Sequence, residues 1–157
     1  MAGKVTILLT DDSLDKACVA FNVALGAAAA EKEVAIFFTC WSLRVLRRAG
    51  RSAGRGLVPR MMDWTTRGGA ARLPLSRWNF FGLGAWMMRR AMRRGHLDLV
   101  PQQIATAREL GVKFYVCDKP AQLFGLGLED LLPVVDGVVG VPSLLLWTTT
   151  SQTTLCF

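Results

Sequence analysis

A cysteine stands where an expected strand meets an expected short helix, and no residue of the chain is better placed to do chemistry. Residues 112–116 are β-favouring or apolar apart from one lysine, and the pattern changes to helix at Cys117. Asp118 is a suitable N-cap, Pro120 is tolerated in a first helical turn, and Gly125 can end the helix in the left-handed conformation. We therefore expect the thiol to lie on a turn, at the positive end of a helix.

A thiol in this position is suited to nucleophilic chemistry. Unpaired N–H groups and the helix dipole favour a thiolate, and Lys119 adds a nearby positive charge, whereas the charge of Asp118 acts in the opposite direction. Strand ends at the carboxyl edge of a parallel sheet are where open α/β proteins bind and react. The alternative for Cys117 is simple packing, because cysteine is often buried as a small hydrophobe.

The elements that must position this cysteine begin with a βαβ unit. Residues 4–10 have the pattern of a buried strand, residues 14–32 that of an Ala-rich helix, and residues 34–39 that of a second buried strand. The right-handed crossover that such units prefer predicts a parallel sheet and an α/β fold. The other expected elements are helices over about 41–49, 85–94, 99–110, 128–132 and 141–150, and strands over 134–139 and 153–157.

The chain has three further cysteines and one histidine, His96. Cys40 follows the second strand much as Cys117 follows its own, so the two thiols approach each other if the strands are neighbours; Cys40 is then a candidate resolving cysteine, and packing is the alternative. We expect Cys18 to pack inside its helix and Cys156 to lie in the core. The spacing lacks a C-x-x-C motif and supports neither a zinc site nor a disulfide framework, so we expect no metal and no cofactor.

The length and composition indicate one domain, residues 1–157, with a core of its own. Apolar residues make up 52% of the chain, yet the longest apolar runs, at 17–30 and 138–147, are shorter than the roughly 18 to 20 residues that a membrane span needs. We expect the surplus to cover a sheet on both faces and to form a subunit interface. Residues 1–4 lead directly into a strand without a secretory signal, so we expect a cytoplasmic location.

Positive charge is concentrated in the middle of the chain. The segment between Trp41 and Val100 contains 13 arginines and only two acidic residues, Asp63 and Asp98, so its local net charge is +11. The formal net charge of the whole chain is +7. Glycine, proline and arginine break any period between residues 50 and 69, so we expect an Arg-rich insertion at about 50–72.

The helix expected at residues 85–94 carries a basic face formed by Arg89, Arg90, Arg93 and Arg94. Three interpretations compete: a solvated face, a patch for nucleic acid or a membrane surface, and a docking site for an acidic protein. No nucleic-acid-binding module matches, so we expect no nucleic-acid partner. A Gly-x-Gly at residues 82–84 has no strand before it and only weakly suggests a phosphate loop.

Taken together, the segments resemble the DsrE/DsrF-like sulfurtransferase family, in particular its DsrE-like, peroxiredoxin-like branch. The resemblance covers nearly the whole chain, and the segments that carry it, in order, are residues 8–12 with 15–17, 37–43, 75–79 with 82–84, and 111–117. It implies a three-layer α/β/α fold with a mainly parallel sheet of about five strands, assembled as a homo-oligomer. Through the resemblance, Ser76, Asn79, Gly82 and Gly84 belong to a family motif or lid.

The resemblance also implies a function. Cys117 matches a cysteine that carries sulfur as a persulfide, taking it from a rhodanese-type donor and passing it to a small TusA-like carrier. We expect Lys119, Lys16 and Asp118 to be the candidates for controlling the anion there, residues 73–86 to shield it from water, and the basic face to dock an acidic partner.

Two other functions remain open on the sequence alone. One is a non-catalytic oligomeric or membrane-surface scaffold that uses the basic, aromatic residues 44–94. The other is a thiol peroxidase, which would need Cys40 as a resolving thiol.

Overall fold

The computed structural model describes residues 3–48, 69–77 and 80–157. Most of the Arg-rich insertion expected at 50–72 therefore lies outside the described residues, as does Asn79 of the family motif. The end of the insertion includes a short 3₁₀-helix, η2 (Ala70–Arg72).

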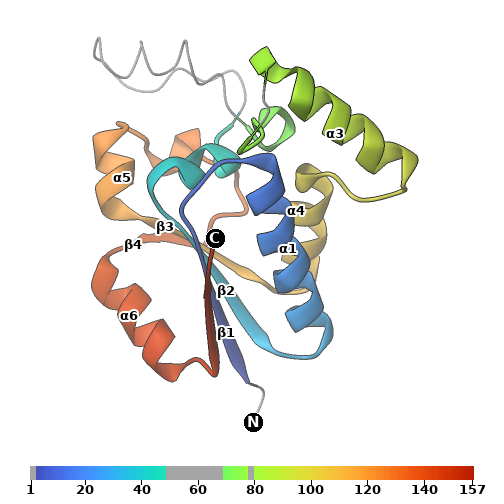
Figure 1. The fold of residues 1–157 in the computed structure, drawn as a ribbon. Helices are drawn as coiled ribbons and strands as arrows, with labels where there is room; N and C mark the ends of the chain where they lie inside the picture. The colour runs from blue at the N-terminus through green and yellow to red at the C-terminus, as the bar shows by residue number, and fades with distance from the viewer. Residues whose placement is uncertain (1–2, 49–68, 78–79) are drawn as a thin grey trace.

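A five-stranded sheet forms the centre of the molecule (Figure 1). Its strands are β1 (Lys4–Leu9), β2 (Glu33–Phe38), β3 (Lys113–Cys117), β4 (Gly137–Val139) and β5 (Thr153–Cys156). They lie in the order β4-β3-β2-β1-β5, and each of the four pairings is parallel. The prediction of a parallel sheet is confirmed.

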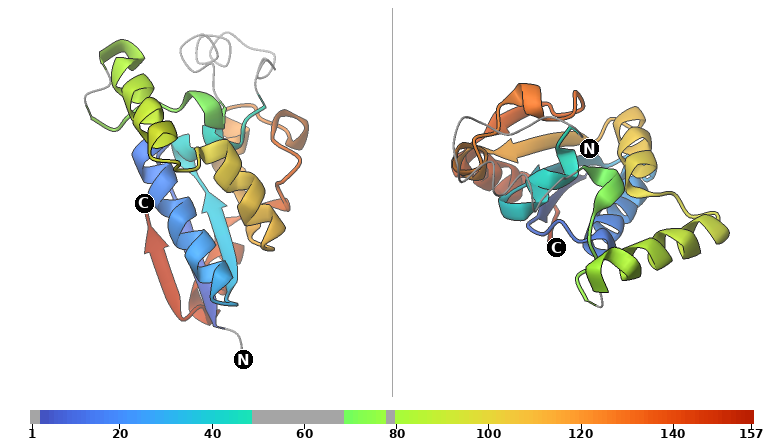
Figure 2. Two further views of the ribbon diagram at one scale, coloured as in Figure 1. Left: turned by 90° about the vertical axis from the view of Figure 1, so that its right-hand side faces the viewer. Right: turned by 90° about the horizontal axis from the view of Figure 1, so that it is seen from above.

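Helices lie on both faces of this sheet, which gives the three layers that we expected (Figure 2). One face is covered by α1 (Leu14–Ala29) and α4 (Val100–Glu109), which pack on each other. The other face is covered by α6 (Val141–Thr150), whose Trp147 contacts Phe37 and Tyr115. Around the sheet lie η1 (Cys40–Leu46), η3 (Phe80–Gly82), α3 (Leu83–Arg94), α5 (Asp118–Leu123) and η4 (Leu128–Asp130).

The two faces are buried to different degrees. Between the sheet and the α1/α4 layer, Phe21, Phe38 and Phe114 are fully buried and contact one another. By contrast, α6 has no buried residue, and its Leu145 and Leu146 are exposed. The core therefore lies on the α1/α4 side of the sheet.

Several boundaries differ from the expected ones. The segment expected to be helical at 41–49 is the 3₁₀-helix η1, and β4 is three residues long because Pro133 and Val134 form a turn. The helix after β3 begins at Asp118, so Cys117 itself is the N-cap in place of Asp118. Within the described residues, no helix combines the length and apolar character needed to cross a bilayer.

Candidate functional site at the carboxyl edge of the sheet

Cys117 is the last residue of β3 and the N-cap of α5, as its strand-to-helix pattern predicts. The thiol is free and partly exposed. Gly125, with φ of 62°, follows α5 in the left-handed conformation that favours glycine. Near the start of β3, the N–H of Phe114 donates to the Asp136 carboxylate at 2.8 Å, which fixes β3 against the turn that leads into β4.

The side chain of Cys117 projects from the less densely packed face of the sheet. Side chains alternate along a strand, and Phe114 and Val116 are buried in the α1/α4 core. Tyr115 and Cys117 therefore face the side of α6, where Tyr115 contacts Trp147. A protein or small molecule that approaches this edge from the α6 side can reach the sulfur.

Asp118 is the charged group beside the thiol. The Cys117 Sγ lies 3.9 Å from Asp118 Oδ1 and donates to it. The other oxygen, Oδ2, points towards Gly140, the N-cap of α6, where a Cβ would come within 3.9 Å of it. Lys119 is exposed. The site thus contains the N-termini of two helices and the Asp118 carboxylate.

Cys40 is the first residue of η1, two residues after the end of β2, the strand that pairs with the β3 strand of Cys117. Phe38 of β2 is opposite Val116 of β3, so the two chains reach this edge side by side. The first turn of η1 also packs against the end of α5, because the rings of Trp41 and Phe124 lie 5.3 Å apart. The strands that lead to Cys40 and Cys117 are therefore neighbours, as an approach of the two thiols requires. Both thiols are free, and Cys40 is exposed. Its role as a resolving thiol stays a prediction.

A buried serine holds the turn that carries Cys40. The Ser42 hydroxyl accepts the N–H of Thr39 at 2.9 Å and donates to the carbonyl of Leu9 at 2.6 Å, which ties η1 to the end of β1. Cys40 itself has a φ of 52°, a left-handed conformation that is unusual for a residue with a side chain. The sequence signal for Ser42 was its place three residues after Thr39, as at a helix start, and its role was missed.

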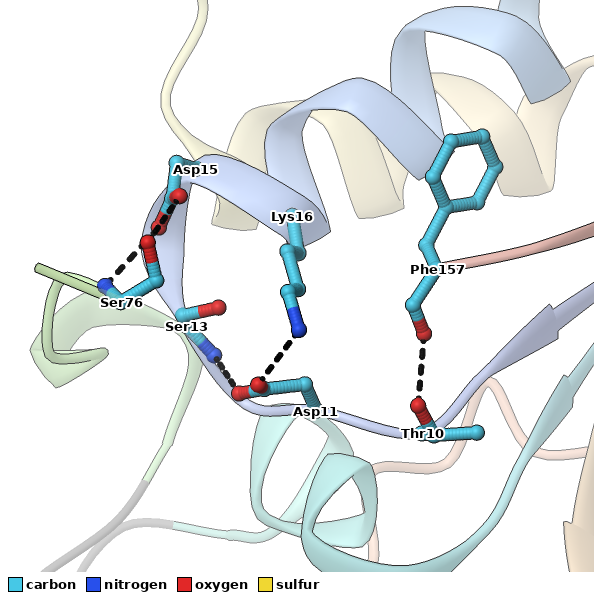
Figure 3. A network of polar contacts seen from close by, with 7 residues as sticks. All are labelled: Thr10, Asp11, Ser13, Asp15, Lys16, Ser76 and Phe157. Carbon is cyan, nitrogen blue, oxygen red and sulfur yellow. Dashed lines mark hydrogen bonds and ion pairs between the residues drawn. The ribbon is translucent and has the colours of Figure 1, made fainter.

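Lys16 and Asp11 form an ion pair at the β1 end of the edge (Figure 3). The Lys16 ammonium lies 2.8 Å from Asp11 Oδ2, and the Ser13 N–H donates to the same carboxylate. Burial alone would raise the pKa of Asp11, but these hydrogen bonds outweigh it and lower the pKa. Because β1 is two strands away from β3, the structure does not bring Lys16 to Cys117, contrary to our expectation.

Of the family-motif residues, Ser76 lies at the β1 end of the edge. The N–H and hydroxyl of Ser76 donate to Asp15 in the first turn of α1, and the Leu14 N–H donates to the Pro74 carbonyl (Figure 3). Gly82 is the N-cap of α3 with φ of 95°, and Gly84 lies in the first turn of α3. Pro74 and Ser76 therefore contact the start of α1, and shielding of Cys117 by residues 73–86 stays a prediction.

Asp12 and Arg44 form a largely buried ion pair that the sequence did not reveal. Asp12 follows β1, and Arg44 lies on η1 after β2, so only the adjacency of the two strands brings them together. Burial raises the pKa of Asp12, and the charge of Arg44 offsets part of this effect. Among the described residues, no group of three or more His, Cys, Asp or Glu side chains could hold a metal ion.

The other two cysteines differ in exposure. Cys18 lies half-buried in α1, consistent with packing. Cys156 is exposed on the edge strand β5, so the expectation that it lies in the core was wrong. Nothing in the sequence places β5 at the edge of the sheet beside β1, where its residues are largely exposed.

The arrangement can be compared with known proteins. The chain matches the DsrE/DsrF/DrsH-like family over residues 1–156. It is 35% identical over 134 residues to the uncharacterized protein YrkE of Bacillus subtilis, covering 85% of this chain and 84% of the relative. Its fold is similar to the crystal structure of ychN protein from E. coli, with a TM-score of 0.60 and 12% identity over 100% of both chains. This chain therefore belongs to the DsrE/DsrF/DrsH-like family.

Proposed function

We propose that this protein is a sulfur carrier or sulfurtransferase in which Cys117 accepts sulfane sulfur as a persulfide and passes it on in a sulfur relay. The observation that carries the proposal is the place of Cys117, a free and partly exposed thiol at the end of a central parallel strand and at the start of a helix. Family membership over nearly the whole chain supports it.

Both steps of this relay balance without an external oxidant. The Cys117 thiolate attacks the outer sulfur of a donor persulfide, forming a new S–S bond while the donor S–S bond breaks and the donor leaves as a thiolate. An acceptor thiolate then attacks the outer sulfur on Cys117, and Cys117 leaves as a thiolate. The chain therefore ends in the state in which it began.

The residues around the sulfur have distinct proposed roles. The unpaired N–H groups at the start of α5 and the exposed ammonium of Lys119 favour the anion. Asp118 Oδ1, 3.9 Å from the sulfur, accepts a hydrogen bond from the thiol, and the negative charge of Asp118 opposes that of the anion. Cys40, at the start of η1 just after the neighbouring strand β2, is the second thiol that a bound persulfide could react with.

The proposed partners are a rhodanese-type donor and a small TusA-like acceptor, and the protein acts as a homo-oligomer. The less densely packed α6 side of Cys117 is the proposed path by which both partners reach the sulfur.

The test is the intact mass of the reduced protein after exposure to a persulfide donor, followed by peptide mapping. We expect a gain of one sulfur atom on Cys117 that reductant removes. Cys117→Ser should lose the gain, whereas the matched control Cys156→Ser, which removes another accessible thiol, should keep it. No gain, or an equal gain on all four cysteines, would overturn the proposal and favour a non-catalytic scaffold.

A further inference from the structure

The exposed side of α3 combines large apolar side chains with arginines. Of its 12 residues only Ala85 and Met92 are buried, and the helix lies on the outside of the molecule, at the end towards which the strands point (Figures 1 and 2). Residues spaced three or four apart share one face of a helix. Trp86, Arg90 and Arg93 therefore lie along one exposed stripe.

The beginning of this helix is apolar. The exposed large side chains are Phe80, Phe81, Leu83, Trp86 and Met87. Phe81 is fully exposed. It lies in a turn in which Phe80, Phe81 and Gly82 all have positive φ angles. Exposed apolar residues that are contiguous in this way are unusual on a soluble surface and indicate an interaction site.

The end of the helix is cationic, with four arginines in its last six residues. A cavity of about 350 Å³ is lined, among the described residues, by Trp86, Arg89, Arg90, Arg93 and Arg94. Arg89 donates to the Leu73 carbonyl and Arg90 lies over the Trp86 ring, but no carboxylate among the described residues pairs with any of the four. Guanidinium groups bind phosphate oxygens in a bidentate manner, so the stripe is complementary to a phosphate-bearing surface.

We propose that α3 docks the protein onto an anionic phospholipid membrane, with the apolar first turn inserted among the lipids and the arginines bound to headgroup phosphates. Trp86 lies between the apolar residues at the beginning of this segment and the arginines at its end. Tryptophan, apolar residues and arginines are the residue types that occur where a helix lies in a membrane interface. The inference does not depend on the chemistry of Cys117.

The shape of the site favours a lipid surface over an acidic protein. Phe81 is fully exposed in η3, directly before α3, a helix that lies on the outside of the molecule (Figure 2), and an exposed apolar group of this size needs a preformed pocket in a protein partner. A fluid bilayer adapts to it without one. Docking through α3 would also present the carboxyl edge of the sheet at the same end of the molecule as the membrane.

The experiment is co-sedimentation of the full-length reduced protein with vesicles of phosphatidylcholine mixed with phosphatidylglycerol, and with phosphatidylcholine alone. We expect binding to the anionic vesicles that weakens as salt is added. The triple variant Arg90→Gln, Arg93→Gln, Arg94→Gln should bind about a hundredfold more weakly, from the contribution of a basic residue near an anionic surface. Phe81→Ser should bind about tenfold more weakly.

The matched control removes three other exposed cations, through Lys32→Gln, Arg72→Gln and Arg77→Gln, and should retain most of the binding. Circular dichroism should show that all variants remain folded, because the substituted side chains are exposed. Equal binding to neutral vesicles, an equal loss in the control, or no vesicle binding would overturn the proposal. So would binding of inorganic phosphate or a polyglutamate peptide at α3 by a chain that ignores vesicles, which would assign the stripe to a soluble phosphate or to an acidic protein.

Discussion

At the scale of single residues, the four thiols differ in exposure: Cys40 and Cys156 are exposed, whereas Cys18 is half-buried in α1. Burial, with a smaller contribution from Asp15, raises the pKa of Cys18 to about 11. At pH 8 only about one Cys18 in a thousand is then a thiolate. We predict that iodoacetamide applied to the native protein at pH 8 labels Cys40 and Cys156 and leaves Cys18 unlabelled, as read by peptide mapping.

The control is the denatured protein, in which all four cysteines should react. Labelling of native Cys18 at the rate of the exposed Cys156 would contradict the prediction.

The carboxylate of Asp118 lies beside the proposed sulfur-carrying thiol, with 3.9 Å between its Oδ1 and the Cys117 Sγ. Removing a unit charge about 4 Å from a thiolate is worth about 1 kcal/mol even in water. We therefore predict that Asp118→Asn increases the alkylation rate of Cys117 at pH 7 by about fivefold or more, measured by timed labelling and mass spectrometry. Asp98→Asn removes an exposed carboxylate from another part of the chain and should leave the rate unchanged. A slower rate in Asp118→Asn would mean that Asp118 acts instead as the base that removes the thiol proton.

At the scale of elements, Asp136 fixes the start of the strand that ends at Cys117. Its carboxylate accepts the Phe114 N–H and the Arg108 guanidinium, at 2.8 and 2.7 Å. Burial alone would raise the pKa of Asp136, but these hydrogen bonds and the nearby charges lower it. A lowered pKa in the folded state stabilises the protein above the ordinary carboxyl pKa, and this stabilisation is lost as the pH falls through the folded pKa.

We predict that Asp136→Asn lowers the free energy of unfolding at pH 7 by about 1–3 kcal/mol, the usual cost of losing charged hydrogen bonds at a largely buried site. The difference from the parent chain should shrink as the pH falls below about 3.8, the ordinary carboxyl pKa. Urea unfolding at pH 7 and pH 3 measures both values. A difference that stays constant between the two pH values would show that the charge of Asp136 is not what stabilises β3.

The strands and helices were largely predictable because their signals are local. The apolar runs of β1, β2 and β3 and the caps around α1 and α4 lie within each segment, and the expected boundaries differ from the observed ones by a few residues. The same local signals predicted that Cys117 lies between strand and helix.

The long-range contacts were not predictable from such signals. The pairing of β5 with β1, which places Cys156 at the sheet edge, joins residues at opposite ends of the chain. The ion pair of Asp12 with Arg44 likewise requires the β1–β2 adjacency, and the Lys16 partner depends on side-chain geometry at the end of β1. The sequence shows that these charged and polar side chains are present, but it does not show which of them are in contact in the fold.

At the scale of the whole molecule, α6 leaves one face of the sheet incompletely covered. Trp147 turns inward to Phe37 and Tyr115, whereas Leu145 and Leu146 are 57% and 67% exposed. The α6 helix connects β4 and β5, the two edge strands of the sheet, which also carry exposed side chains. An apolar helix face bordered by sheet edges is the kind of surface that a second copy of the chain covers in an oligomer.

We predict that the parent chain self-associates through α6 and that Leu145→Glu with Leu146→Glu converts it to a monomer, measured by sedimentation velocity. Two buried leucines contribute several kcal/mol to an interface, and two carboxylates there would repel each other. Arg90→Gln with Arg93→Gln on α3 is the control and should leave the assembly intact, because α3 is the proposed lipid-binding element. A monomeric parent chain, or an oligomer that survives the double glutamate variant, would contradict the assignment; dissociation by the α3 variant would instead make α3 the subunit interface and would remove the free surface on which membrane docking depends.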